Sequence, residues 1–260
     1  MSNSVPAEPT QPPFRAIADL AREHARSNPD SPALRHGERA MSWRELDVFM
    51  DRVAAALQQG GVQPTQAIAI CGANAIEYAA VFMGALRAGV AVAPLPAGAL
   101  PSQVATMVAD SGATLFFADS SVAAFETPAR RISLDGVSQG EPLRDWMAAA
   151  GTAPQPVRVE PGWPFNIIYS SGTTGTPKGI VQPHSMRWSH VSRAENYGYG
   201  PGTVTLIATS LCSNTTLVCF FPTMAKGGCA VFGAPKFDAA AYLALAEKSR
   251  ATHTLSLIHI

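Results

Sequence analysis

Apolar residues recur every three or four positions from Phe14 to His24, and this spacing predicts an amphipathic helix. The helix should end before Pro29, because the residue ahead of a proline avoids helical backbone angles. Two short apolar runs within 33–41 then flank a Gly37-Glu38 turn, which predicts a small hairpin. The N-terminal part of the chain is therefore expected to hold a helix followed by two short strands.

A regular alternation of strands and helices follows. Ser42 and Glu45 have the spacing of a capping box, in which the hydroxyl and the carboxylate each accept from a free amide at the start of a helix. Further strands are expected at 67–71, 90–94, 114–118, near Ile132, and at 165–169, 204–208 and 229–232. Further helices are expected at 75–87, 102–110, 143–149, 185–197, 216–225 and 238–249. This order predicts an α/β fold with layered, parallel-rich β-sheets covered by helices. The apolar run at 252–260 predicts one more buried strand.

Composition narrows the function classes. The chain has 260 residues, with 19 basic and 19 acidic side chains. This balance removes the electrostatic attraction on which nucleic-acid binding and polybasic membrane binding depend. No apolar run approaches the roughly 18 residues that a membrane-spanning helix needs, and the first 13 residues do not resemble a signal peptide. We expect a disordered tail at 1–13, one folded unit at 14–260, a cytoplasmic location, and neither nucleic-acid nor membrane partners.

The four cysteines show no CxxC spacing, so neither a metal site nor a disulfide framework is expected. Cys219 and Cys229 lie among apolar neighbours and are interpreted as buried small side chains. Trp188, Phe220 and Phe221 are interpreted as core or pocket wall. His184 precedes a predicted helix and is interpreted as a structural polar residue.

The segment from Tyr169 to Gly179, YSSGTTGTPKG, follows an apolar strand and is dense in hydroxyls and glycines. Hydroxyls, backbone amides and one lysine together suit a phosphate group, whereas a flexible linker would not include the stiff, charged Pro-Lys-Gly. The candidate nucleotide-binding residues are Ser170, Ser171, Gly172, Thr173, Thr174, Gly175, Thr176 and Lys178. The Walker pattern fails, because Pro177 takes the place of its second glycine and Gly179 follows the lysine. The dinucleotide fingerprint GxGxxG also fails, since Gly172 has no glycine partner at 170.

This segment resembles the phosphate loop of the adenylate-forming superfamily, written [YF][TS]SGTTGxPKG, at all eleven positions. The superfamily includes acyl- and aryl-CoA synthetases, luciferases and the adenylation domains of peptide synthetases. Two more segments are similar to the family's patterns: 41–46 to "LTYxEL" and 86–95 to "LKAGAxxVPL". The resemblance runs from about residue 14 to about 254, and it departs at Pro96, where the family often has Asp or Asn.

The resemblance implies a two-step reaction. A carboxylate attacks the α-phosphorus of ATP to give an acyl-adenylate and pyrophosphate, and a thiol, usually that of coenzyme A, then displaces AMP. It also implies that Mg²⁺ accompanies ATP and that the partner is a small carboxylic acid. By this resemblance, 14–260 corresponds to an incomplete N-terminal large domain. The small C-terminal domain and the lysine that promotes adenylation are absent, so no catalytic residue and no metal ligand are assignable.

A second segment, Ser210–Thr216, resembles the family's "PLYHNT" at the acyl pocket, which makes Ser213 and Asn214 candidate substrate-binding residues. Cys212 and Ser213 replace the aromatic residue and the histidine of that pattern. Amino-acid-activating relatives have an aspartate there, and none occurs at 209–224, which disfavours an α-amino acid substrate. A plain helix N-cap remains an alternative interpretation of these residues.

Two hypotheses follow for the whole chain. In the first it is an N-terminal fragment of an acyl- or aryl-CoA ligase that is inactive by itself, because the loop lacks partners to position the carboxylate. In the second it is a non-catalytic module that binds a nucleotide or an acyl group. Saturable ATP binding with cooperative unfolding would favour the module, whereas aggregation or molten behaviour would favour the fragment.

Overall fold

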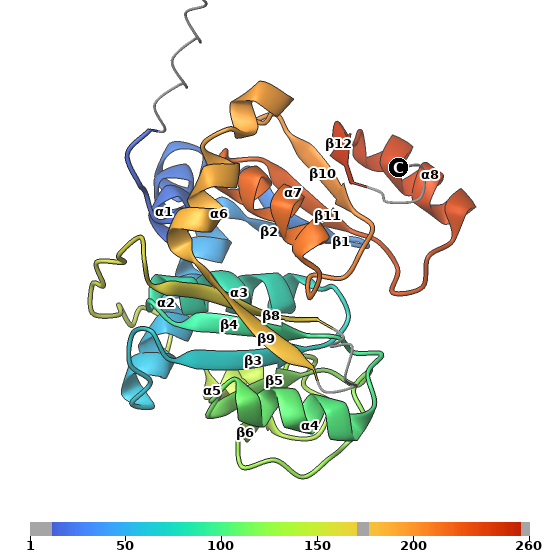
Figure 1. Cartoon of the computed structure of the whole chain (residues 1–260). Coiled ribbons are helices and arrows are strands. Elements are labelled where there is room, and N and C mark those ends of the chain that lie inside the picture. Colours follow the sequence, from blue (N-terminus) through green and yellow to red (C-terminus); the bar gives the residue numbers. More distant parts are fainter. Residues whose placement is uncertain (1–11, 171–176, 256–260) are drawn as a thin grey trace, which may run out of the picture.

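The computed structural model describes residues 12–170 and 177–255, which form two β-sheets with helices around and between them (Figure 1). The larger sheet has the order β7-β6-β5-β3-β4-β8-β9. Its strands are β3 (Ala67–Cys71), β4 (Ala91–Leu95), β5 (Leu115–Ala118), β6 (Arg130–Ser133), β7 (Glu141–Pro142), β8 (Pro164–Ser170) and β9 (Lys178–Pro183). All neighbours pair in parallel except β9, which is antiparallel to β8. Every residue of β3, β4 and β5 is buried, as expected for parallel strands covered on both faces.

The smaller sheet combines the two ends of the chain. Its order is β12-β10-β11-β1-β2. The strands are β1 (Pro32–His36), β2 (Arg39–Ser42), β10 (Val204–Ile207), β11 (Cys229–Phe232) and β12 (His253–Thr254). The predicted N-terminal hairpin is confirmed as β1 and β2, and β1 pairs in parallel with β11. The hairpin therefore extends a sheet whose other strands come much later in the sequence.

The helices are α1 (Ile17–Ser27), α2 (Trp43–Gln59), α3 (Ile76–Arg87), α4 (Pro101–Asp110), α5 (Leu143–Trp146), α6 (His184–Val191), α7 (Asn214–Ala225) and α8 (Ala239–Ser249). The predicted capping box of α2 is confirmed, since the Ser42 hydroxyl accepts from the Glu45 amide and the Glu45 carboxylate accepts from the Ser42 amide. Helix α3 packs against β1 of one sheet and against β3 and β4 of the other. Helix α3 lies between the layers (Figure 1), and all its residues except Glu77 are buried. The helix therefore joins the two sheets into one core.

Three expectations on secondary structure were wrong in detail. The helix expected at 185–197 ends at Val191, and only a 3-10 turn, η1 (Ala194–Tyr197), follows before Gly198 takes a left-handed conformation. The helix expected at 143–149 ends at Trp146, because Met147 is extended. The segment 178–183 forms strand β9, although it was expected to be part of a loop. Its exposed apolar side chains lack the alternation that identifies a half-buried strand.

The C-terminal part is less buried than expected. The helix expected at 238–249 is confirmed as α8, but only Ser249 of its residues is buried, and Leu243 is exposed. The strand expected over 252–260 is seen as β12, which is partly exposed instead of buried. Residues 256–260 lie outside the described part of the chain, as do residues 1–11 of the expected tail. Within the described ranges, no helix has the length and apolar character needed to cross a bilayer.

Candidate functional site

The predicted phosphate-binding loop falls between the end of β8 and the start of β9, and β9 is an edge strand of the larger sheet (Figure 1). Ser170 and Lys178 face each other as the last pair of the antiparallel ladder, and both residues are exposed. The other candidates, Ser171, Gly172, Thr173, Thr174, Gly175 and Thr176, lie outside the described residues. The described ends of the loop thus place a hydroxyl and an ammonium group at the same end of one hairpin.

Tyr169 attaches this end of the hairpin to helix α4. Its hydroxyl donates to Asp110 Oδ2 at 2.7 Å and lies 3.1 Å from the Met107 carbonyl oxygen. Burial and then the Asp110 carboxylate raise the pKa of Tyr169 above its usual range, so the phenol stays protonated and can donate. Gly179 lies opposite, where a Cβ atom would be 3.2 Å from both the Tyr169 ring and Asp110 Oδ2. The hairpin end is therefore held against the core of the domain by short, specific contacts.

A buried arginine on α6 connects the hairpin to the start of α7. The Arg187 side chain is fully buried. Its Nη2 donates to the Asn166 Oδ1 of β8 at 3.3 Å, the Gln182 Oε1 of β9 at 2.8 Å and the Asn214 Oδ1 of α7 at 3.0 Å. We call these four residues the Arg187 cluster. It brings Asn214, a predicted substrate-binding residue, to the hairpin that carries the loop.

The second predicted substrate residue, Ser213, lies at the N-cap position of α7. Its backbone carbonyl accepts from the amides of Thr216 and Leu217, but its side chain makes no capping hydrogen bond. The helix begins at Asn214, two residues earlier than expected. Ser213 is therefore the N-cap of α7 by its backbone position, but its hydroxyl does not cap the helix.

The carboxyl ends of strands from both sheets meet at a groove of about 290 Å³. Its wall includes the residues that directly follow β3, β4, β10 and β11, namely Gly72, Pro96, Ala208 and Gly233. Ser210 and Cys212, from the turn before α7, line it as well. Open α/β sheets bind ligands outside the carboxyl ends of their strands, so this groove has the position of a small-molecule site. Pro96, the departure from the family pattern, lies on its wall.

Asn74 fixes the turn before α7 by two hydrogen bonds across the groove. Its Nδ2 donates to the Thr209 carbonyl at 2.8 Å, and its Oδ1 accepts from the Leu211 amide at 2.8 Å. Because Asn74 follows β3 and the turn follows β10, these bonds join the two sheets at the groove. The side chain thereby holds Ser210 and Cys212 in place on the wall.

Replacing Asn74 with alanine should lower the free energy of unfolding by about 1–3 kcal/mol, because it leaves the buried Leu211 amide and the Thr209 carbonyl without partners. Asn74→Asp keeps an acceptor for Leu211 but turns a carboxylate oxygen toward the Thr209 carbonyl oxygen, so it should lower the free energy of unfolding as well. Urea unfolding of the unchanged protein, Asn74→Ala and Asn74→Asp measures their free energies of unfolding. Equal midpoints for Asn74→Ala and the unchanged protein would contradict this role for Asn74.

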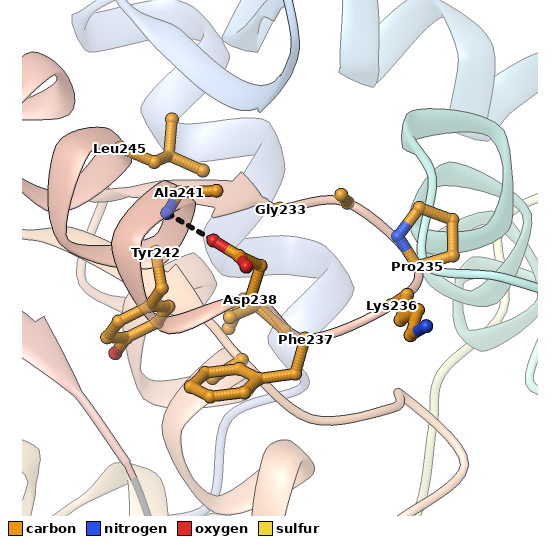
Figure 2. Close-up of a pocket in the computed structure, with 11 residues that line it drawn as sticks. Gly233, Pro235, Lys236, Phe237, Asp238, Ala241, Tyr242 and Leu245 are labelled. Atoms are coloured by element: carbon orange, nitrogen blue, oxygen red, sulfur yellow. Dashed lines mark hydrogen bonds between the residues drawn. The ribbon is translucent and has the colours of Figure 1, made fainter.

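A second hollow of about 190 Å³ continues the groove toward α8 (Figure 2). It shares Ile207, Ala208 and Gly233 with the first. Asp238 caps α8 there, since its Oδ1 accepts from the Ala241 amide at 2.8 Å, as the dashed line in Figure 2 shows. Lys236 and Phe237 lie on the loop between β11 and α8, so an amphipathic surface extends from the groove to the outside of the domain.

The titratable groups near the site act as structural elements. His184 packs edge-on against the rings of Phe14 and Phe165, and burial lowers its pKa to about 4, so it is neutral near pH 7. Burial raises the pKa of Cys219 and Cys229 to about 11 and that of Cys71 to about 12. These thiols stay protonated and are poor nucleophiles.

The burial expected of the remaining single residues is confirmed. The buried residues are Trp188, Phe220, Phe221, Cys219 and Cys229. In the ranges 12–170 and 177–255, no group of three or more His, Cys, Asp or Glu residues is arranged to hold a metal ion.

Sequence reasoning missed Arg187, Asn166, Gln182 and Asn74. Arg187 stands on the apolar face of α6, between the buried His184 and Val191. A charged residue at a buried helical position was the one available signal, because such residues are rarely buried without a purpose. No pattern connects Asn74 to a turn more than 130 residues later.

The chain is similar to known proteins in sequence and in fold. The family model described as AMP-binding enzyme matches residues 21–257. The chain is 28% identical to phosphinothricin tripeptide synthetase PhsB of Streptomyces viridochromogenes over 87% of its length, which is 19% of that protein. It is 28% identical to the fatty acid–[acyl-carrier-protein] ligase ScoC of Streptomyces coeruleorubidus over 66% of its length, which is 34% of ScoC.

A solved structure from Rhodopseudomonas palustris, which bears the name of a long-chain-fatty-acid CoA ligase, superposes with a TM-score of 0.83 at 20% identity. The match covers 94% of this chain and 64% of that one, which confirms the expected α/β fold. The chain thus spans about a fifth of the length of PhsB and about a third of the length of ScoC. Because the family model covers most of its length, the chain belongs to the AMP-binding enzyme family.

Proposed function

We propose that this chain contributes the phosphate loop and one wall of the acid site to an enzyme that activates a carboxylic acid with ATP. The acid would attack the α-phosphorus, giving an acyl-adenylate and pyrophosphate. A thiol would then displace AMP, and we propose coenzyme A as that thiol. The observation that carries the proposal is the position of the loop motif, which joins β8 to β9 in a member of the AMP-binding enzyme family.

The donors of the loop suit ATP chemically. An anion that attacks a polyanion needs the β- and γ-phosphates held and their charge offset. Ser170, Ser171, Gly172, Thr173, Thr174, Gly175, Thr176 and Lys178 supply hydroxyls, backbone amides and one ammonium group. Lys178 makes no ion pair with a described carboxylate, so its charge is available to a phosphate. Mg²⁺ bound with ATP would offset further phosphate charge.

The acid would lie in the groove between the sheets. This groove borders the turn that leads to Ser213 and Asn214, and the Arg187 cluster links Asn214 to the hairpin of the loop. The hairpin that carries the loop and the turn beside the groove are therefore connected by one set of hydrogen bonds, which would help to hold two bound substrates in line for attack.

The choice of thiol is a separate proposal. The groove continues past Lys236 to the outside of the domain, so a flexible thiol could reach it from solvent. A free coenzyme A and a carrier-protein arm are both thiols, and the relatives bear names of both kinds, with ScoC named for an acyl-carrier protein.

The test uses the protein expressed from its complete reading frame. Acid-dependent exchange of radioactive pyrophosphate into ATP, measured over a panel of fatty, aryl and amino acids, is expected for at least one acid. With that acid, thioester formation with coenzyme A is compared with transfer to a carrier protein from the same genome. Saturable ATP binding without exchange for any acid would favour the non-catalytic module instead.

The 260 residues by themselves are expected to show no exchange at an enzymatic rate, because the chain spans only part of each relative. The same assay with residues 1–260 measures this directly. Exchange at the rate of the complete protein would contradict the expectation.

A further inference from the structure

The end of the hairpin formed by β8 and β9 has two different faces, because side chains alternate along a strand. Ile167 and Tyr169 pack against the apolar cluster that contains residues of α4. Ile168, between them, packs against the larger cluster that contains residues of α3. By the same alternation, Ser170 and its ladder partner Lys178 lie on the face opposite Tyr169. We call the side that carries Tyr169 the α4 face of the hairpin, and the side that carries Ser170 and Lys178 the phosphate face.

The contact between the α4 face and helix α4 depends on one proton. The Tyr169 hydroxyl lies 2.7 Å from Asp110 Oδ2 and 3.1 Å from the Met107 carbonyl oxygen. A phenol has a single proton, and the shorter distance gives that proton to the carboxylate. A Cβ atom at Gly179, opposite Tyr169, would lie 3.2 Å from both Asp110 Oδ2 and Tyr169 Cε1. The hairpin therefore has no room for a further side chain here, and the hydrogen bond determines how it sits on α4.

Asp110 stands at an unfavourable place for a carboxylate. It is the last residue of α4, where the helix dipole disfavours negative charge. The last turn of α4 has no basic residue, and no ion pair between described residues includes Asp110. The side chain is exposed, so an uncharged residue would suit the helix at least as well. The hydrogen bond from Tyr169 is the described interaction that accounts for a carboxylate at this position.

We propose that Tyr169 and Asp110 are positioning residues for ATP. Their hydrogen bond fixes the α4 face of the hairpin to the domain, and it thereby holds Ser170 and Lys178 on the phosphate face in the position from which they bind the phosphates. Neither Tyr169 nor Asp110 touches the nucleotide. This inference rests on the proposed function, because it takes Ser170 and Lys178 as phosphate ligands.

The physical basis is preorganisation. Ser170 and Lys178 are exposed and form the last pair of the ladder, and β9 is an edge strand, so little else restrains this end of the hairpin. A binding group that is already ordered loses less conformational freedom when the ligand arrives. A hydrogen bond to an ionised acceptor is about twice as strong as one between neutral groups, which suits it to this task. The described wall of the acid groove includes neither Tyr169 nor Asp110, so the effect should be confined to ATP.

The first variant is Tyr169→Phe, which removes the hydroxyl and keeps the ring. In the complete protein, pyrophosphate exchange gives kcat and the KM of ATP and of the acid, and calorimetric titration with Mg²⁺ and ATP gives Kd. Both constants for ATP should rise about tenfold, the size expected for one hydrogen bond to a charged group. The KM of the acid should stay within about twofold. An unchanged Kd for ATP would overturn the proposal.

The matched control for Tyr169→Phe is Tyr199→Phe. Tyr199 is also half-buried, and its ring packs against His253, away from the hairpin. Tyr199→Phe removes the same atom and should leave both ATP constants within about twofold. An equal loss in Tyr199→Phe would mean that any missing phenol hydroxyl weakens the protein, which contradicts a specific role of Tyr169.

Variants of Asp110 test the other side of the bond. Asp110→Ala removes the acceptor at an exposed helix end, so the fold should be kept and the loss in ATP affinity should equal that of Tyr169→Phe. Asp110→Asn keeps an oxygen acceptor and should stay within about threefold of the unchanged protein. Its urea midpoint should not fall, since a negative charge leaves the C-terminal end of α4. Asp145→Ala, at an exposed aspartate of α5, is the matched control. Unchanged ATP affinity in Asp110→Ala would overturn the proposal even if Tyr169→Phe failed to fold.

The double variant shows whether the two residues act through one bond. Tyr169→Phe combined with Asp110→Ala should bind ATP as weakly as either single variant, because each substitution already breaks the same bond. Additive losses would contradict this. A merely structural role would lower the urea midpoint and would affect the constants of ATP and of the acid alike, without recovery in Asp110→Asn.

The outcomes also separate this proposal from the one on which it rests. If the unchanged complete protein neither binds ATP nor supports exchange with any acid, the proposed function fails and the role of Tyr169 and Asp110 fails with it. If the protein binds ATP and activates an acid, but the ATP constants do not depend on these two residues, only their positioning role is overturned.

Discussion

Replacing Lys178 with alanine is expected to lower kcat/KM for ATP in pyrophosphate exchange about a hundredfold, the size of effect seen when one preorganised charge or donor is removed from an active site. Lys178 begins β9 opposite Ser170, at the described end of the phosphate loop, and it is exposed. The loss follows because the developing charge on the leaving pyrophosphate would be offset by one cation fewer.

The Lys178 test needs a matched cation elsewhere. Lys248 lies on α8 and pairs with Glu38, so Lys248→Ala removes the same side chain away from the loop and should leave exchange within about twofold. Lys178→Arg should recover part of the activity, since it keeps the charge but changes the geometry. Full activity of Lys178→Ala would show that the lysine does not bind phosphate, whatever the rest of the motif does.

A large effect on stability is also expected at Gly84, where α3 packs against α2. A Cβ atom at this position would lie 2.6 Å from Val53 Cβ and 2.8 Å from Val53 Cγ1. Both helices are buried there, so the backbone must shift. Gly84→Ala should therefore lower the free energy of unfolding by about 2 kcal/mol, despite the better helix propensity of alanine.

A compensating substitution makes the Gly84 prediction specific. Val53→Ala removes Cγ1 and keeps Cβ, so it relieves part of the clash with the added methyl group and should cost less in the Gly84→Ala background than by itself. Gly162→Ala is the matched control, because a Cβ atom there meets nothing within 4 Å. Urea unfolding of these variants gives the coupling energy. Additive losses would mean that the two helices separate without contact between these side chains.

Much of the fold follows from local pattern. The periodicity after Cys71 predicts the helix that becomes α3, and the apolar runs predict the buried strands of the larger sheet. The Ser42 capping box appears where the spacing places it. These features depend on neighbours within a few residues, which is why one sequence is enough to predict them.

The candidate site divides in the same way. The residues of the loop follow one another in the sequence, so their suitability for a phosphate group can be predicted without a structure. The Arg187 cluster is not continuous, since its members come from β8, β9, α6 and α7. Its central residue, Arg187, is a buried cation, although arginine is a residue type that is usually exposed.

By itself, the sequence determined the alternation of strands and helices, the phosphate-loop chemistry and the resemblance to the adenylate-forming superfamily, because each resides in a short stretch of chain. Tertiary structure alone decided that the hairpin of β1 and β2 joins β11, that Asn74 reaches the turn before α7, and that Arg187 orients Asn214. These contacts depend on how the two sheets pack on α3. The free energy that selects that packing comes from apolar area buried between distant segments, and no local spacing records it.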